Sequence, residues 1–547
     1  MLFRRPTACA LGINGVLLIL FILFGVVRYG SLDDYFMAAT LTGVYGSEYD
    51  PHLVFINVAL GYLLKPFYII FPAVGWFYIF ELLSVFAAFS IFSFFIIRRL
   101  GPRWGIPFAF LISSSSIDFY AGISFTQCAA LLVASGGLLF FFGCRENRSI
   151  FLYAGIALVV LGAMTRWQMF LLGIPFILSP FLFEREPFSF FQRKNVVTLL
   201  LCVAAILSLK YFDEQSYADN DYKYYREYQW KRSFFGDGAH YDVDGVYDEL
   251  EERGMSAHDF QLLRGWSFYD TDVFSLDSLD TIVKVANHSA YPINWRRMPA
   301  ATFLAISNAF AKNLAWNWFF VCILLLLFSD KRKRMYPWYS LTLCVGAYFY
   351  LLSLNRLANH VEMGMWVYAF AMGVTLLKGD PPKSTKTTCA ISLFAVAVLC
   401  LNLFCLPKVE CEGSLVKTPS VPQDWKDFLA YADAHPENAY LLSFARYKEL
   451  GMFKDPAYKA AQPGSWQNIF TLGYWNINHP AMKRELAKRG VANPLRDIVK
   501  DNVYLIETEN IPEYVLFYQE HYHKNLKVDT VKAFGSLMVL KYREVIK

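Results

Sequence analysis

The sequence predicts a polytopic α-helical membrane protein of about eleven transmembrane helices with a C-terminal extracytoplasmic α/β or α+β domain. Of its 547 residues, 56% are hydrophobic and only 18% are charged, whereas a soluble domain is usually about one-quarter charged. Apolar runs of about 20 residues recur along the chain, which is long enough to cross a hydrocarbon core of roughly 30 Å. These runs are continuous rather than alternating, which disfavours a β-barrel.

The first apolar segment, residues 8–27, predicts a retained membrane span. Its apolar core is too long for a cleaved signal peptide, and no small-residue cleavage site follows it. Arg4 and Arg5 precede the segment, so the N-terminus is expected in the cytoplasm. Asp33 and Asp34 then emerge on the far side of the membrane, where acidic groups close to the bilayer indicate a functional site.

The later apolar segments alternate with short basic loops. Such loops stay on the cytoplasmic side, so their positions set the topology. The loops carrying Lys or Arg are residues 98–103, 145–148, 184–194, 330–334 and 378–386. The spans expected between them are residues 76–97, 106–117, 128–142, 151–164, 169–183, 196–209, 316–328, 338–354, 361–377 and 389–406.

Residues 53–71 are an exception to this pattern. Hydropathy alone predicts a span, but the segment carries Lys65 and Pro66 near its middle. If it crossed the membrane, every later basic loop would lie outside. The segment is therefore predicted to lie along the outer membrane surface or to re-enter, which leaves the C-terminus outside.

This topology divides the chain into a membrane module, residues 1–406, and an extracytoplasmic soluble domain, residues 407–547. The module has a first outer loop at residues 28–75 and a long outer loop at residues 211–313. In the soluble domain, short β-like runs alternate with charged helical stretches. The runs are residues 440–444, 503–506 and 537–542, and one helical stretch is residues 481–489.

Charge and cysteine content exclude several classes of protein. The net charge of +5 is concentrated in short loops, which suits membrane topology and gives no indication of nucleic-acid binding. The ten cysteines lie mostly in or beside apolar segments without CxxC spacing. Neither a disulfide framework nor a zinc site is therefore indicated.

The first hundred residues follow a recognisable layout. Asp33 and Asp34 come after the first span, Asp50-Pro51-His52 comes next, and the surface segment leads into the span at residues 76–97. This order resembles the GT-C integral membrane glycosyltransferases, which include protein O-mannosyltransferases and lipid A aminoarabinose transferases. Bacterial glucosyltransferases of O-antigen or cell-wall polymers are the most similar group. The remainder matches only in architecture, and Pro51-His52-Leu53 departs from the Pro-Pro doublet of the pattern.

The resemblance implies a reaction and a location. The donor would be a sugar on a polyprenyl phosphate, and the acceptor a hydroxyl of an extracytoplasmic glycan, lipid or protein. A carboxylate would act as general base, and the polyprenyl phosphate would leave. The protein would lie in a bacterial plasma membrane and contribute to surface polysaccharide or cell-wall synthesis.

Asp33 and Asp34 are the candidate bases, because a base must lie within hydrogen-bond reach of the acceptor hydroxyl. The alternative is a structural role, since Ser31 followed by Asp34 is a variant of the helix capping box. Both roles can hold together, and the choice of base between the two residues stays open. Two adjacent carboxylates could also hold a divalent cation, but we expect a metal-independent reaction.

Cations in short outer loops are the candidate ligands of the donor phosphate. Arg166, Arg356 and His360 occupy two such loops, and Lys65 could reach the same phosphate from the surface segment. Guanidinium groups pair well with phosphate oxygens. The alternatives are snorkelling at the lipid interface or, for Arg166, an ion pair with Glu81.

Candidate acceptor or sugar ligands lie in both outer loops. Asp50 and His52 come from the first, and Arg232 and Asp237 come from an aromatic-rich part of the second. A transporter or flippase of a lipid-linked sugar is the main alternative function. It is less favoured because most charge lies in outer loops rather than at mid-membrane and no inverted repeat is visible.

Overall fold

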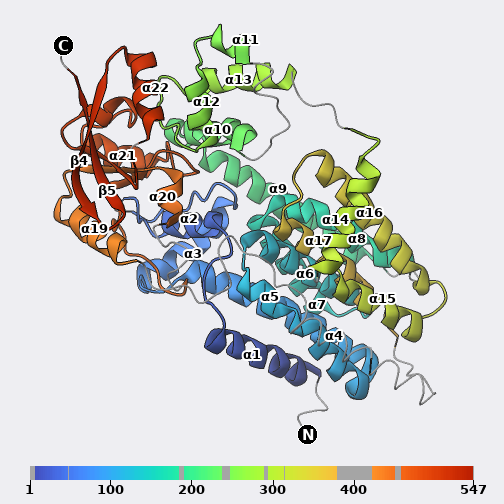
Figure 1. The fold of residues 1–547 in the computed structure, drawn as a ribbon. Helices are drawn as coiled ribbons and strands as arrows, with labels where there is room; N and C mark the ends of the chain where they lie inside the picture. Colours follow the sequence, from blue (N-terminus) through green and yellow to red (C-terminus); the bar gives the residue numbers. More distant parts are fainter. Residues whose placement is uncertain are drawn as a thin grey trace.

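The computed structural model describes residues 6–46, 48–183, 190–236, 247–288, 294–312, 314–378, 393, 422–449, 457–509 and 511–545. Asp237, the boundary predicted near residue 406, and nearly all of the span predicted at residues 389–406 lie outside these ranges. Over the described residues the protein is mostly helical, with a small sheet near its C-terminal end (Figure 1).

The helices fall into three groups along the chain. The first group is α1 (Pro6–Phe24), α2 (Leu32–Leu41), α3 (Val58–Ile70), α4 (Trp76–Ser114), α5 (Ser116–Ala121), α6 (Phe125–Arg145), α7 (Ser149–Thr165), α8 (Trp167–Phe183) and α9 (Arg193–Ser216). The second is α10 (Asn220–Gly236), α11 (Tyr247–Glu251), α12 (Ala257–Arg264) and α13 (Leu276–His288). The third is α14 (Met298–Ala311), α15 (Trp316–Phe328), α16 (Tyr336–Ser353) and α17 (Asn359–Thr375), with the short η4 (Lys333–Met335) before α16.

Among the described residues, four stretches of helix are long and apolar enough to cross a membrane: α1, α4 with α5, α6, and α9. The number is five if the bent pair α14 and α15 forms one span. Helix α6 is almost wholly buried among the others, whereas α1 and α9 expose large apolar side chains such as Leu23 and Leu200. A wide exposed apolar surface of this kind fits contact with lipid.

Helix α4 turns back on itself at Gly101. The Oγ atoms of Ser93 and Ser113 lie 2.8 Å apart, although 20 residues separate them, and a straight helix of that length would span about 30 Å. Gly101 makes the turn with a φ of +73°, a conformation that glycine adopts without steric cost. The two arms correspond to the segments predicted separately at residues 76–97 and 106–117.

The basic loops meet at one end of the helices. Each contact joins two segments that are far apart in the sequence, and each lies away from the C-terminal domain (Figure 1). The contacts run from Arg98 Nη2 to Glu146 Oε2, Arg99 Nε to the Leu377 carbonyl, Lys194 Nζ to Ser149 Oγ and Arg332 Nη2 to the Leu182 carbonyl, all at 2.7 Å.

Helix α3 forms most of the surface segment predicted at residues 53–71. It begins after Asn57, whose side-chain oxygen accepts a hydrogen bond from the Ala59 N–H at 3.0 Å. Its 13 residues span about 20 Å, which is short of the roughly 30 Å of a hydrocarbon core. One face is buried, and the other exposes Tyr62, Leu63, Phe67, Ile69 and Ile70.

The C-terminal domain contains a five-stranded sheet with the strand order β2-β1-β3-β5-β4. β1 (Ala439–Leu442) runs parallel to β2 (Ile469–Thr471) and to β3 (Val503–Glu507), while β5 (Leu537–Glu544) is antiparallel to β3 and to β4 (Leu526–Phe534). Its helices are α19 (Gln423–Ala434), α20 (Phe444–Glu449), α21 (Pro480–Lys488), η6 (Arg496–Val499) and α22 (Pro512–Tyr522). The predicted runs correspond to β1, β3 and β5, and the predicted helix to α21.

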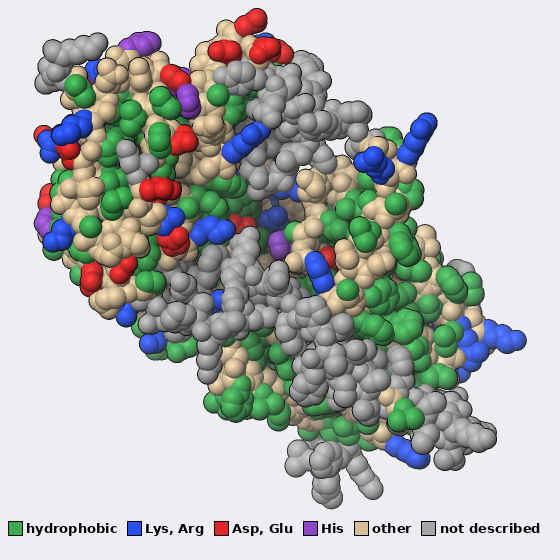
Figure 2. All heavy atoms as spheres, viewed as in Figure 1, with side chains coloured by type: hydrophobic (Ala, Val, Ile, Leu, Met, Phe, Trp, Pro, Cys, Tyr) green, Lys and Arg blue, Asp and Glu red, His purple; other side chains and the backbone are tan. Residues whose placement is uncertain are grey.

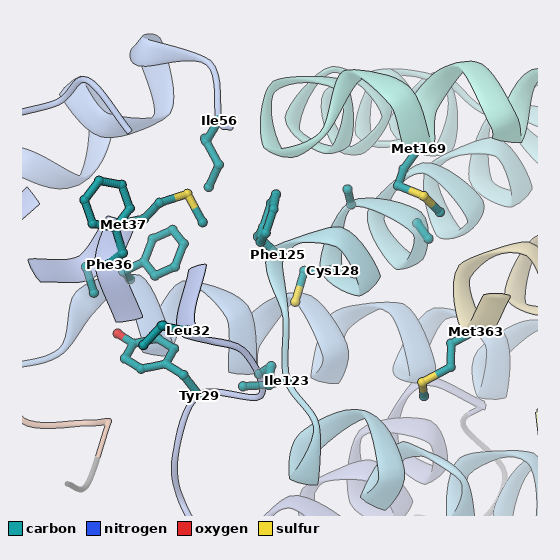
Figure 3. Packing of buried hydrophobic residues seen from close by; sticks show 14 of the residues in the cluster. Tyr29, Leu32, Phe36, Met37, Ile56, Ile123, Phe125, Cys128, Met169 and Met363 are labelled. Atoms are coloured by element: carbon teal, nitrogen blue, oxygen red, sulfur yellow. The ribbon is translucent and has the colours of Figure 1, made fainter. Parts of the chain in front are cut away.

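Helix α2 packs between this domain and the helix bundle. Phe36 lies edge-on to Tyr474 of the C-terminal domain at 6.0 Å, and the Trp466 N–H donates to the Val44 carbonyl at 3.0 Å. Figure 3 shows Met37 of α2 and Ile56 of the first outer loop pointing toward one another beside Phe125, the first residue of α6. This packing fixes the start of α2, where the acidic pair lies.

Candidate functional site

A cavity of about 2100 Å³ opens between the first outer loop, the helix bundle and the C-terminal domain. It brings together Asp33, Arg166, Arg356 and His360, which come from three separate loops of the sequence. Figure 2 shows basic, acidic and histidine side chains around a hollow between the C-terminal part and the helices. The cavity therefore combines an acidic group with several cationic ones.

The two adjacent aspartates have different surroundings. Asp33 lines the cavity, whereas Asp34 is fully buried behind it. Ser31 caps α2 by accepting the Asp34 N–H, and its hydroxyl donates to the Asp34 carboxyl. The other Asp34 oxygen accepts the Phe125 N–H at 2.8 Å. The cap at Ser31 is the structural role that the sequence offered as an alternative, and the bond from Phe125 also joins the start of α2 to the start of α6.

Glu81 of α4 is the second buried acid at this position. It is fully buried, and its carboxyl group lies close enough to that of Asp34 for the two to interact directly. Burial raises the pKa of Asp34 to about 7, against the hydrogen bonds from Ser31 and Phe125, which lower it. Two buried carboxyl groups this close are costly to ionise together. The ion pair expected between Glu81 and Arg166 is not formed.

Asp33 receives a hydrogen bond from the C-terminal domain. The Tyr474 hydroxyl donates to Oδ1 of Asp33 at 2.5 Å across a sequence separation of 441 residues. Tyr474 follows β2 and has a φ of +78°. At the preceding Gly473, an added Cβ would lie 1.9 Å from the Trp266 carbonyl oxygen, so only glycine fits there. The C-terminal domain therefore orients Asp33, the partly exposed carboxylate of the pair.

The cations reach the cavity from two short loops. Arg166 lies between α7 and α8, with its guanidinium carbon 5.1 Å from the ring centre of Phe125 and 5.4 Å from that of Phe55. Arg356 is exposed in the loop before α17. Burial, together with the charge of Arg166, lowers the pKa of His360 to about 4, so its imidazole is neutral at pH 7. The positive charge of this group therefore comes from the two arginines.

Besides Asp34, four other described candidate site residues do not line the cavity. Lys65 lies on α3, partly exposed. Asp50 and His52 form a buried junction, with His52 Nδ1 2.7 Å from Asp50 Oδ1 and the Tyr222 hydroxyl donating to Oδ2 of Asp50. Burial alone would raise the pKa of Asp50, but the His52 hydrogen bond holds it well below its usual range. This junction joins the first outer loop to α10.

Arg232 of α10, the fourth of these residues, is buried behind the cavity wall. Its guanidinium carbon lies 3.7 Å from the ring centre of Trp475 and 4.4 Å from that of Trp266. Both tryptophans line the cavity, so Arg232 holds the wall rather than forming it. The contact also ties the long outer loop to the C-terminal domain.

Sequence patterns missed a charged group on α9 and α10. Lys210, Asp213 and Arg226 line the cavity. Asp213 Oδ1 accepts the Val58 N–H at 2.8 Å, and Oδ2 lies 3.9 Å from Arg226. Burial raises the pKa of Asp213. The one local feature that could have indicated this charged group is the change from an apolar run to polar residues at the end of α9.

One wall of the cavity is apolar. Its side chains come from α8, α9 and α16, three helices of the bundle. They are Leu171, Leu172, Phe176, Ile206, Leu209, Leu343 and Leu351. An apolar wall next to a cationic group suits an amphiphilic ligand with a charged head and a hydrocarbon chain.

Among the described residues, one group has the spacing of metal ligands: Asp259, Glu520 and His521, whose ligand atoms lie within 4.8 Å of one another. It lies between α12 and α22 and does not line the cavity. Comparison with protein-family models, curated proteins and solved structures finds no significant match to the chain.

Proposed function

We propose that the protein is a GT-C-type membrane glycosyltransferase that moves a sugar from a polyprenyl phosphate to a hydroxyl of an extracytoplasmic glycan, lipid or protein. It would lie in a bacterial plasma membrane with about eleven spans, the N-terminus inside and the C-terminal domain outside. The observation that carries the proposal is the single cavity that presents Asp33, Arg166 and Arg356 beside an apolar wall.

Each part of the cavity has a role in this reaction. Asp33 takes the proton of the acceptor hydroxyl, whose oxygen forms a bond to the anomeric carbon. The bond from that carbon to the phosphate oxygen breaks, and the polyprenyl phosphate leaves with the electron pair. Arg166 and Arg356 stabilise the negative charge on the departing phosphate.

The apolar wall and Tyr474 support the same assignment. An isoprenoid chain needs a hydrocarbon surface beside the charged head, which α8, α9 and α16 supply. The Tyr474 hydroxyl donates to Oδ1 of Asp33 and so holds this carboxylate in the lining of the cavity. Asp34 stays buried and links α2 to α6, so Asp33 is the proposed base.

Asp33→Asn tests the proposal. The purified protein in proteoliposomes is given polyprenyl-phosphate-linked hexoses and extracytoplasmic acceptors, and radiolabelled product is measured. Loss of a general base should lower transfer by about 10²–10⁴-fold. Asp248→Asn is the matched control, because Asp248 is exposed on α11 and does not line the cavity.

The same proteoliposomes separate the enzyme from a flippase. A glycosyltransferase yields glycosylated acceptor and free polyprenyl phosphate, whereas a flippase moves the lipid-linked sugar between leaflets without cleaving it. Full transfer by correctly inserted Asp33→Asn protein would refute the assignment of Asp33 as base. Movement of the intact donor without product in the wild type would refute the enzyme itself.

A further inference from the structure

Helix α10 has two faces with different surroundings. On one face, the Tyr225 hydroxyl donates to the Trp475 carbonyl at 2.8 Å, and Gln229 Nε2 donates to the Ile477 carbonyl at 2.7 Å. The helix is thereby fixed to the C-terminal domain. The cavity is lined by side chains of the same helix, Lys223, Arg226, Glu227, Trp230 and Ser233, together with Gln229 at the border of the two faces.

The spacing of these side chains places them along one stripe of the helix. Lys223, Glu227 and Trp230 stand at positions i, i+4 and i+7, which face the same side of an α-helix. Most residues of α10 are polar, and Trp230 is a large aromatic side chain that is 67% exposed on it. A large, mostly exposed aromatic side chain in the same lining as cations, a carboxylate and a hydroxyl suits a ligand with one apolar face and many hydroxyl groups.

We propose that this stripe of α10 binds a saccharide, with a pyranose ring stacked on Trp230 and its hydroxyl groups directed to Lys223 and Glu227. The inference rests on the proposed glycosyltransferase function and narrows the acceptor to a glycan. The apolar wall lies on other helices, α8, α9 and α16, so the lipid donor and the glycan acceptor occupy different sides of one cavity. Asp33 and Tyr474 belong to the same lining.

Direct binding tests the inference without relying on transfer. Saturation-transfer NMR is recorded on the full chain in nanodiscs with free oligosaccharides of hexoses and N-acetylhexosamines. Trp230→Ala should weaken binding at least tenfold, while Trp230→Phe should retain most of it because a ring remains. Trp338→Ala is the matched control, because Trp338 is also 67% exposed but does not line the cavity.

The inference would be overturned if Trp230→Ala bound saccharide as well as the wild type, or if the wild type bound no oligosaccharide. It would also be overturned if both alanine variants lost membrane insertion equally, because both tryptophans would then be lipid anchors. Asp33→Asn separates the two proposals. It should bind saccharide like the wild type but fail in transfer. Transfer by Asp33→Asn refutes the base alone, and normal glycan transfer by Trp230→Ala refutes the saccharide site alone.

Discussion

Two neighbouring carboxyl groups at the start of α2 have separate tasks because their surroundings differ. Asp33 faces the cavity and is held by Tyr474, whereas Asp34 is enclosed with Glu81 between α2, α4 and α6. A buried carboxyl group with a raised pKa stabilises the folded state most while it stays protonated. The protonation of Asp34 therefore links the position of its neighbour Asp33, the proposed base, to the pH.

Asp34 should make the stability of the protein depend on pH. Burial raises its pKa in the folded protein to about 7, compared with about 4 in the unfolded chain. Between these values the folded state holds the proton and the unfolded state does not, so the free energy of unfolding falls as the pH rises. The slope from this group is at most about 1.4 kcal/mol per pH unit.

Melting temperatures between pH 4 and pH 8 check this expectation. Asp34→Asn keeps an acceptor for the Phe125 N–H and removes the titration, so its melting temperature should fall less steeply with rising pH than that of the wild type. Asp248→Asn should follow the wild type. Parallel curves for Asp34→Asn and the wild type would contradict a raised pKa at Asp34.

Local sequence patterns identified part of the cavity. Asp33 stood out as an acidic residue close to the membrane after the first span, and Arg166, Arg356 and His360 stood out as cationic groups in short outer loops, where positive charge is scarce. All four line the cavity. Tyr474 could not be predicted in the same way, because its contact with Asp33 joins residues 441 positions apart. Asp50 and His52 also stood out, but they are buried with Tyr222 in a junction between elements.

At the scale of single elements, length and exposure explain which predictions failed. β2 has three residues, too few to show an alternating pattern, and β4 carries mostly partly exposed or exposed side chains at the edge of the sheet. The turn of α4 at Gly101 was anticipated, because the basic residues around it separate two apolar runs. Clusters of basic residues therefore predicted the turns between bundle helices more reliably than strand propensity predicted the short strands.

Helix α3 should lie at the membrane surface rather than cross it. A spin label at Ile70, on the exposed apolar face, should report a depth of about 5–10 Å below the headgroups. A label replacing Lys527 of the C-terminal domain should stay in water. Depth measurement by electron paramagnetic resonance with oxygen and a nickel chelate gives both values. A label at Ile70 near the bilayer centre would contradict the surface location and would place the later basic loops outside.

The arrangement of the whole molecule suggests its orientation. The basic loops contact one another at one end of the helices, and the C-terminal sheet lies toward the other (Figure 1). The cavity is lined in part by residues of this C-terminal region, Phe444, Tyr474 and Trp475. Positive charge gathered at one end is expected to face the cytoplasm. The cavity would then open on the extracytoplasmic side, where a polyprenyl-phosphate sugar and a surface glycan could meet.

Single cysteines at the two ends should report this orientation. Lys331 lies in the basic loop after α15, and Lys532 lies on the exposed strand β4. Each is replaced by cysteine in a separate variant. A membrane-impermeant maleimide should label Lys532→Cys in intact cells, and should label Lys331→Cys only after permeabilisation. The described native cysteines are buried or partly buried, so the unsubstituted protein provides the background. Labelling of Lys331→Cys in intact cells, with protection of Lys532→Cys, would invert the topology and would leave the cavity facing the cytoplasm.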